Sequence, residues 1–181
     1  MRKNYFSKTF KALLAIVSCC AFMNVWAIEI HVQKAGTLPT LLPTCSESTL
    51  KVTGTINGTD VKHLRQLIGA GVTSLDLAGV KIVSGGVAYD GTNKTENDVI
   101  GTAMFKECTK LRSIELPTSI SAIHSNAFAR SGLTKVDIPN SVSRLGGDAF
   151  AYCNSLNTVV IGSRVSKLDQ GVFYSSPVKT V

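Results

Sequence analysis

Four phenylalanines, Phe105, Phe128, Phe150 and Phe173, recur in the second half of the chain at intervals of 23, 22 and 23 residues. A period of this length is typical of repeat proteins, in which each unit packs mainly on its neighbours. Other apolar positions keep the same step, namely Leu116, Ile138 and Ile161, then Ile120, Val142 and Val165, then Ile123, Leu145 and Leu168. We therefore predict a repeat architecture for this part of the chain.

Each unit contains one short stretch with the period-two pattern of a half-buried strand, as in Ile114-Glu115-Leu116. The return through Ile120, Ile123 and Phe128 predicts a tight turn. One unit cannot fold alone, because about seven buried apolar side chains contribute roughly 10–20 kcal/mol against roughly 20–40 kcal/mol of backbone entropy. The sequence thus predicts a repeat solenoid with short parallel strands, about four rungs and phenylalanine packed on phenylalanine.

The cysteines fit the same repeat. Cys108 and Cys153 occupy one position two units apart, where the other units have Ser131 and Ser176. Strands rise about 4.8 Å per layer, so the two cysteines should lie roughly 10 Å apart, too far for a disulfide. We predict buried free thiols in a slot for small residues. No cysteine spacing typical of a metal site occurs after residue 27.

The segment before the repeats has a different character. Residues 28–71 alternate like strands and then show helical spacing from Val61 to Ile68, with Asp60 as the expected N-cap and Gly69 as the expected stop. We predict that residues 28–71 form an N-terminal cap and that residues 72–181 form the repeats. A polar stretch rich in Gly, Asn and Thr, residues 84–98, is predicted to be an exposed inserted loop.

The repeat pattern closely resembles the BspA-like leucine-rich repeat of bacterial cell-surface proteins. The resemblance rests on Leu116-Pro117 through Ala127-Phe128 to Ile138, and on Ile138-Pro139 through Ala149-Phe150 to Ile161. The head, with Leu50-Lys51-Val52-Thr53-Gly54, looks like the cap of secreted members from Bacteroidetes-type bacteria. The resemblance implies a surface adhesion or protein-binding module, and in some members host matrix proteins are bound. Gly162 and Val172 depart from the pattern, and with no terminal cap after Val181 we expect a fragment of a longer array.

The amino-terminal sequence is typical of an export signal. Four basic residues precede or flank the apolar run Ala12 to Met23, and Val25-Trp26-Ala27 fits a cleavage site. The run is too short to span a bilayer, so we expect no transmembrane span. We predict a signal peptide over residues 1–27 and a secreted or cell-surface protein. A second interpretation takes Cys19 as an acylated lipoprotein residue.

Charge and motifs exclude several functions. The net charge of +7 includes Arg2, Lys3, Lys8 and Lys11, so only +3 remains after residue 27 (15 basic and 12 acidic side chains). This argues against nucleic-acid binding. His31, His63 and His124 are predicted to be solvated surface histidines, and no nucleophile with a base is found. We expect no enzyme activity, no metal and no cofactor.

We predict that the outward strand positions bind a protein or glycan partner, such as a host extracellular matrix or surface protein. These positions are Ser74, Asp76, Ser113, Glu115, Lys135, Asp137, Thr158 and Val160. A cation-binding ladder of Asp76, Glu115 and Asp137 is a weaker hypothesis, because Val160 follows on the next unit and Lys135 lies beside the acids. An alternative for the whole chain is an N-terminal scaffold whose activity lies in a further C-terminal domain.

Overall fold

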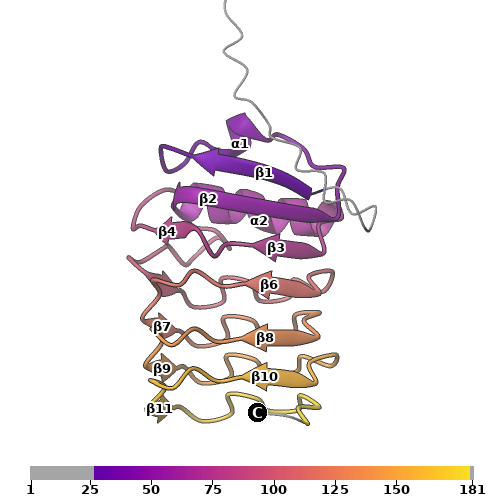
Figure 1. Cartoon of the computed structure of the whole chain (residues 1–181), viewed down its shortest axis with the longest axis vertical. Helices are drawn as coiled ribbons and strands as arrows, with labels where there is room; N and C mark the ends of the chain where they lie inside the picture. The colour runs from indigo at the N-terminus through magenta and orange to yellow at the C-terminus, as the bar shows by residue number, and fades with distance from the viewer. Residues whose placement is uncertain (1–26, 180–181) are drawn as a thin grey trace, which may run out of the picture.

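The structure is a computed structural model that describes residues 27–179. Short strands lie one above another along the long axis of the molecule, below a first layer that contains both helices (Figure 1). The predicted signal peptide, residues 1–27, lies outside the described residues apart from Ala27, and Cys19 lies outside them as well. Within residues 27–179 no helix is long and apolar enough to cross a bilayer.

The first layer consists of β1 (Ala27–Val32), α1 (Leu38–Leu41), β2 (Thr49–Ile56) and α2 (Gly58–Ala70). The N-cap of α2 is Asn57 and not Asp60, so that prediction was wrong. Asp60 is the third helical residue, and its carboxylate accepts a hydrogen bond from the Asn57 backbone N–H at 3.0 Å, which completes a capping box. The helix ends at Ala70 and its C-cap is Gly71, two residues beyond the expected stop at Gly69.

The repeats carry two stacks of short strands. The first stack contains β3 (Ser74–Asp76), β6 (Ser113–Glu115), β8 (Lys135–Asp137) and β10 (Thr158–Val160). The second contains β4 (Val80–Ile82), β5 (Val99–Ile100), β7 (Ala122–Ile123), β9 (Arg144–Leu145) and β11 (Lys167–Leu168).

The pairings between these described strands are all parallel, as predicted. The long strand β2 pairs with β3 near its start and with β4 near its end, so it joins both stacks to the first layer. The second stack was not expected, because its residues were interpreted as a tight turn. Its strands are mostly two residues long, and such short strands show no alternation in the sequence.

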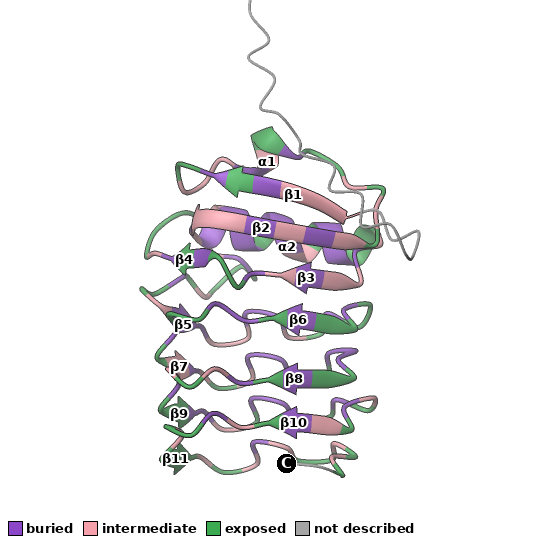
Figure 2. Cartoon of the chain, in the orientation of Figure 1, coloured by how far each residue is buried: buried purple, intermediate pink, exposed green. Residues whose placement is uncertain are grey.

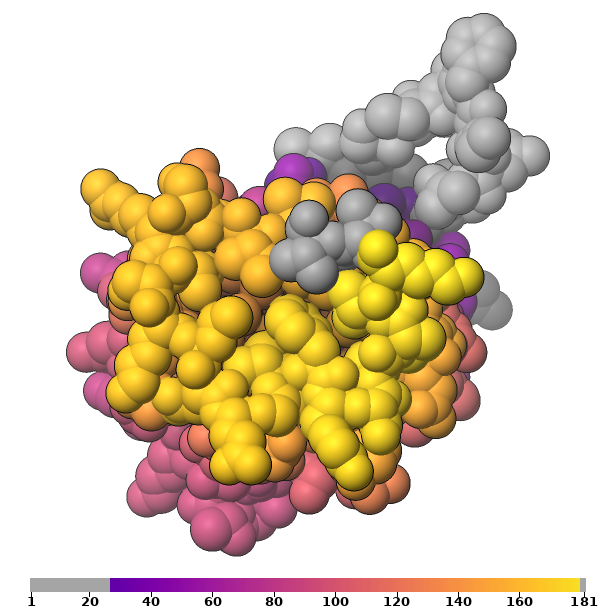
Figure 3. Space-filling model, turned by 90° about the horizontal axis from the view of Figure 1, so that it is seen from below, coloured from indigo at the N-terminus to yellow at the C-terminus, as the bar shows by residue number. Residues whose placement is uncertain are grey.

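The four phenylalanines stack as predicted. Neighbouring ring centroids lie 5.5, 5.1 and 5.6 Å apart along Phe105, Phe128, Phe150 and Phe173, with interplanar angles of 12°, 6° and 19°. The first three rings are fully buried, whereas Phe173 is only half-buried. Its unit forms the end face seen in Figure 3. The middle residue of every strand in the first stack is also buried (Figure 2).

Backbone hydrogen bonds join successive units beside the phenylalanines. The N–H groups of Phe105, Phe128 and Phe150 donate to carbonyls of the next unit at 2.7, 2.7 and 2.8 Å. Residues two places before and after each phenylalanine have a positive φ, as in Asn126 (58°) and Arg130 (59°). Their N–H groups also donate to the next unit, at 3.0 and 2.8 Å. These inter-unit bonds explain why non-glycine residues accept a left-handed backbone there.

The segment at residues 84–98 is not wholly exposed. Tyr89 and Thr95 are buried, and the Tyr89 hydroxyl donates to the Thr102 carbonyl at 2.7 Å. Gly85 and Thr95 form an antiparallel bridge, and the Gly58 N–H at the start of α2 donates to the Gly85 carbonyl at 3.0 Å. The expectation of an exposed loop was therefore wrong for these side chains, which anchor the segment to its surroundings.

The two repeat cysteines are buried free thiols, as predicted. Cys153 Sγ lies 3.3 Å from Ser131 Oγ and donates to the Phe128 carbonyl at 3.1 Å, while Ser176 Oγ donates to the Phe150 carbonyl at 2.6 Å. The slot thus contains a small donor side chain that reaches the phenylalanine carbonyl of the preceding unit.

We expect alkylation of the native protein at pH 8 to modify the half-buried Cys45 at least tenfold faster than Cys108 or Cys153. Burial raises the pKa of the Cys108 thiol to about 11 and also raises the pKa of Cys153, so both remain unreactive thiols. Peptide mapping by mass spectrometry reports each cysteine separately, and denaturant should abolish the difference. In the unfolded chain the Cys108 thiol loses its proton near pH 9, whereas burial keeps it protonated in the native state up to about pH 11. The free energy of unfolding that this thiol contributes is therefore present below pH 9 and lost as the pH rises from 9 to 11. Rapid labelling of both repeat cysteines in the native state would contradict the burial.

Candidate functional site

The eight residues predicted for binding all lie on the first stack of strands. Each flanks a buried middle residue, so its side chain lies on the solvent side. On β6 and β8 both flanking residues are exposed, whereas Ser74, Asp76 and Thr158 are half-buried. Val160 is the one aliphatic member of the set, and half of its surface is exposed (50%). We call the surface made by these eight residues the strand face.

Strand register aligns the strand face into two columns. Ser74 pairs with Ser113 and Asp76 with Glu115. On the later units Lys135 pairs with Thr158, and Asp137 with Val160. The strands β6 and β8 do not pair directly, but the Thr134 N–H and hydroxyl both donate to the Arg112 carbonyl, at 3.1 and 3.2 Å, just before the two strands.

The columns continue onto the first layer, which the sequence analysis missed. Lys51 on β2 pairs in register with Asp76, and Glu29 on β1 pairs with Lys51. Lys51 Nζ and Glu29 Oε1 form an ion pair of 3.2 Å. Alternation around these residues was visible in the sequence, but their register with the repeats was not. The strand face therefore extends over six strands.

Among the described residues, the acidic side chains of the extended face that form no ion pair lie at its centre, on β3 and β6. Asp76 accepts a hydrogen bond from the Ala78 N–H at 2.9 Å, and Asp137 is paired with Lys135 at 2.9 Å within the same strand. Glu115 has no ion pair or side-chain hydrogen bond within residues 27–179. Its carboxylate, opposite Asp76, is available to a cationic group of a partner.

The three histidines occupy different environments, and that of His124 is half-buried, with its Nδ1 3.7 Å from Glu96 Oε1. His31 is exposed, and its Nδ1 lies 3.0 Å from the Thr53 hydroxyl. His63 is buried, and its Nε2 lies 2.7 Å from the Leu42 carbonyl, so the prediction of a solvated residue was wrong for it. Because a carbonyl only accepts, His63 donates from Nε2 and serves the packing of α2. Among the described residues, no group of three or more His, Cys, Asp or Glu side chains could hold a metal ion.

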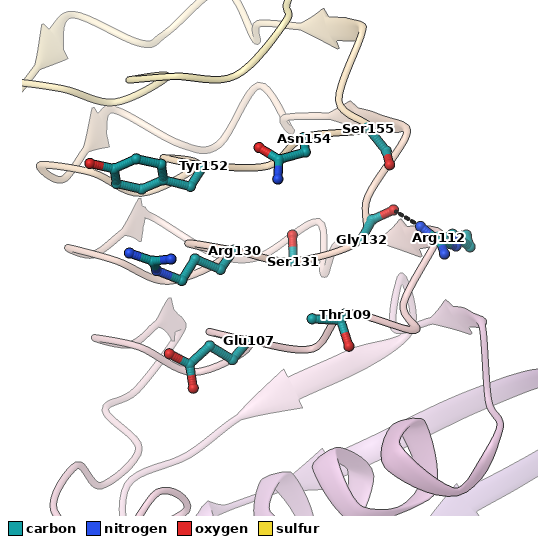
Figure 4. A pocket seen from close by; sticks show the side chains of 9 residues that line it. All are labelled: Glu107, Thr109, Arg112, Arg130, Ser131, Gly132, Tyr152, Asn154 and Ser155. Carbon is teal, nitrogen blue, oxygen red and sulfur yellow. Dashed lines mark hydrogen bonds between the residues drawn. The ribbon is translucent and has the colours of Figure 1, made fainter.

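A polar pocket of about 420 Å³ crosses three repeat units (Figure 4). Each unit contributes three lining residues, and none of the nine residues is Ala, Val, Leu or Ile. Glu107, Arg130 and Tyr152 occupy the same place in successive units, two residues after the phenylalanine, and all have a positive φ. Arg112, just before β6, lies at the opposite end of the pocket from Arg130 (Figure 4). No sequence motif indicated this pocket, because its residues are separated by whole repeat units.

Comparison with known families decides the identity of the repeats. Residues 92–181 match the model of the BspA type leucine rich repeat region, with six copies. These residues belong to the BspA-type leucine-rich repeat family. The chain thus has a leucine-rich repeat fold with short parallel strands, in agreement with the family resemblance seen in the sequence. Among curated proteins, none matches the chain.

Three solved structures resemble parts of the chain at low sequence identity. A leucine rich cell surface protein from Faecalibacterium prausnitzii A2-165 is 20% identical with a TM-score of 0.39, over 73% of this chain and 24% of that one. A leucine-rich repeat protein from Bacteroides ovatus ATCC 8483 is 19% identical with a TM-score of 0.40, over 75% and 36%. The pneumococcal vaccine antigen PcpA is 14% identical with a TM-score of 0.34, over 72% and 26%. The match covers between about a quarter and a third of these chains.

Proposed function

We propose that this leucine-rich repeat chain is an exported, non-catalytic module that binds a protein partner through the strand face. The observation that supports the proposal most directly is the aligned row of outward side chains on successive parallel strands. Their buried neighbours fix the backbone, so the outward residues are held in place at little entropic cost on binding. The basic and apolar amino terminus supports export by a signal peptide and hence a secreted or surface location.

The charge of the face favours a partner with basic side chains. Asp76 and Glu115 lie side by side in register, and Glu115 has no internal ion pair within the described residues. A lysine or arginine of the partner placed between these carboxylates would gain charge-assisted hydrogen bonds. Steering by such charges acts mainly on the rate of association and weakens with salt.

The area of the face limits the proposal. Six strands about 4.8 Å apart, each presenting about three residues of about 3.3 Å as the four repeat strands do, cover roughly 290 Å². A stable interface buries roughly 800 Å² per partner. We infer that neighbouring surface contributes, either from residues 84–98, which contact the start of α2, or from further units in a longer array.

We also infer a separate structural role for each of the two parts of the chain. Residues 28–71 act as an N-terminal cap, because α2 and β2 cover the apolar residues of the first repeat unit, as in the burial of Leu75 beside Leu50. Residues 72–181 form a solenoid of about four rungs, as the four stacked rings suggest. The rungs hold the strand face in register.

Reversing the charge of Glu115 is expected to weaken binding to an immobilised basic extracellular matrix protein at least tenfold. Biolayer interferometry of the purified Glu115→Lys variant measures this, since a lysine there would repel a cationic partner. Glu47→Lys, a charge reversal outside the strand face, is the matched control and should bind like the parent chain. The proposed face would be contradicted if both charge reversals weakened binding equally, or if neither weakened it.

A further inference from the structure

The polar pocket across the three units lies outside the strand face and has a chemistry of its own. It is lined by three residues from each unit, and its volume of about 420 Å³ falls within the range typical of small-ligand sites. Figure 4 shows the side chains of Glu107, Arg130 and Tyr152 one above another along one edge. The pocket therefore follows the stacking direction of the repeats.

The two arginines supply donors that the protein itself does not use. Arg112 Nη1 donates once, to the Gly132 carbonyl at 3.1 Å, which leaves most of its guanidinium N–H groups available. The Arg130 guanidinium carbon lies 4.7 Å from the centroid of the Tyr152 ring, a contact that orients the side chain without occupying its donors. Neither arginine forms an ion pair within residues 27–179.

The remaining lining groups favour a hydroxylated ligand. Thr109, Asn154 and Ser155 line the same pocket, and their side chains form no hydrogen bond with other described residues. Hydroxyl and amide groups of this kind can both donate to and accept from sugar hydroxyls. Clustered arginines also recognise acidic peptides, but such a peptide offers fewer hydroxyl groups to these side chains than a sugar does, so it is the competing ligand in the test.

We propose that this pocket binds an anionic saccharide, that is, a sugar chain that carries carboxylate or sulfate groups. The planar guanidinium groups of Arg112 and Arg130 match the geometry of either anion. The hydroxyl and amide side chains between them hold the sugar ring. The open, stacked shape suits a chain that lies across several units with one side in solvent (Figure 4).

The test compares three variants of the purified full chain with asparagine as the replacement, because asparagine tolerates the positive φ found at two of the sites. Arg130→Asn removes the cation, Glu107→Asn removes the one carboxylate in the lining, and Arg164→Asn removes an exposed arginine outside the pocket. Isothermal titration uses a heparin tetrasaccharide, a non-sulfated uronic-acid tetrasaccharide, neutral maltotetraose and an acidic peptide. Circular dichroism melting verifies that each variant is folded.

We expect the parent chain to bind at least one anionic tetrasaccharide and not the neutral one. Arg130→Asn should weaken that binding about tenfold or more, Glu107→Asn should strengthen it about twofold, and Arg164→Asn should leave it unchanged. The two anionic ligands distinguish sulfate from carboxylate recognition. The proposal is overturned if maltotetraose binds equally well, if neither anionic ligand binds, if an acidic peptide binds more tightly than both, or if Arg164→Asn weakens binding as much as Arg130→Asn.

Discussion

Replacement of Phe128 by alanine is expected to lower the free energy of unfolding by about 3–5 kcal/mol. The Phe128 ring is fully buried between Phe105 and Phe150, with centroid distances of 5.5 and 5.1 Å. The substitution removes apolar surface burial, leaves a cavity and deletes two ring contacts of about 0.5–1.5 kcal/mol each. Domains have only about 5–15 kcal/mol of total stability, so the variant should unfold at much lower urea concentration than the parent.

Phe173→Ala is the matched control for this prediction. Phe173 is half-buried and contacts one ring of the stack, Phe150 at 5.6 Å, so we expect roughly half the loss. Urea unfolding followed by circular dichroism and by tyrosine fluorescence reports both variants, and agreement of the two probes tests for a single transition. If Phe173→Ala cost as much as Phe128→Ala, the stacked rings would not be the core of the repeats.

The ring stack could be predicted from the sequence because its signal is both local and recurrent. Each phenylalanine needs only to return at the same place in the next unit, and a step of 22 or 23 residues fixes that place. The same holds for the buried middle residues of the first strand stack, such as Ile114 and Val136, whose alternation with polar neighbours is visible in three residues. The free thiols of Cys108 and Cys153 followed from the same step.

The second strand stack could not be predicted, because its strands depend on hydrogen bonds between units. Ile123 pairs with Leu145 across two units, and each strand is only two residues long. Nothing within one such strand separates it from a turn. The left-handed residues have the same origin, since Asn126 and Arg130 adopt a positive φ while their N–H groups donate to the next unit.

The same distinction, between features set within one unit and features that depend on several units, applies to the candidate binding surfaces. Residues of the strand face could be placed because each lies beside a buried strand residue of its own unit. Its extension through Lys51 and Glu29 required the register between β1, β2 and β3, which the sequence does not encode locally. The pocket between Arg112 and Arg130 required three units at once and the backbone that orients them.

Replacement of Asp60 by alanine is expected to cost about 3–5 kcal/mol, a loss comparable with that of a central phenylalanine. The Asp60 carboxylate is fully buried and accepts hydrogen bonds from the N–H groups of Gly36, Leu38 and Asn57, at 2.5, 2.8 and 3.0 Å. It thus joins the start of α2 to the segment that leads into α1. Removing the acceptor leaves the buried Leu38 N–H unsatisfied, at about 1–3 kcal/mol for a buried group, and the half-buried Gly36 and Asn57 N–H groups add smaller losses.

Asn57→Ala separates this role from simple helix capping. The Asn57 side chain accepts a hydrogen bond from the Thr59 N–H at 2.9 Å, and loss of an N-cap costs about 1 kcal/mol. Amide hydrogen exchange followed by NMR should show faster exchange at Gly36 and Leu38 in Asp60→Ala, and unchanged exchange there in Asn57→Ala. Both variants damage the same capping box. If they lost equal stability and showed the same amide exchange rates at Gly36 and Leu38, Asp60 would act only in helix capping. A larger loss of stability for Asp60→Ala would show that the Asp60 carboxylate also holds α1 and α2 together through its hydrogen bonds to Gly36 and Leu38.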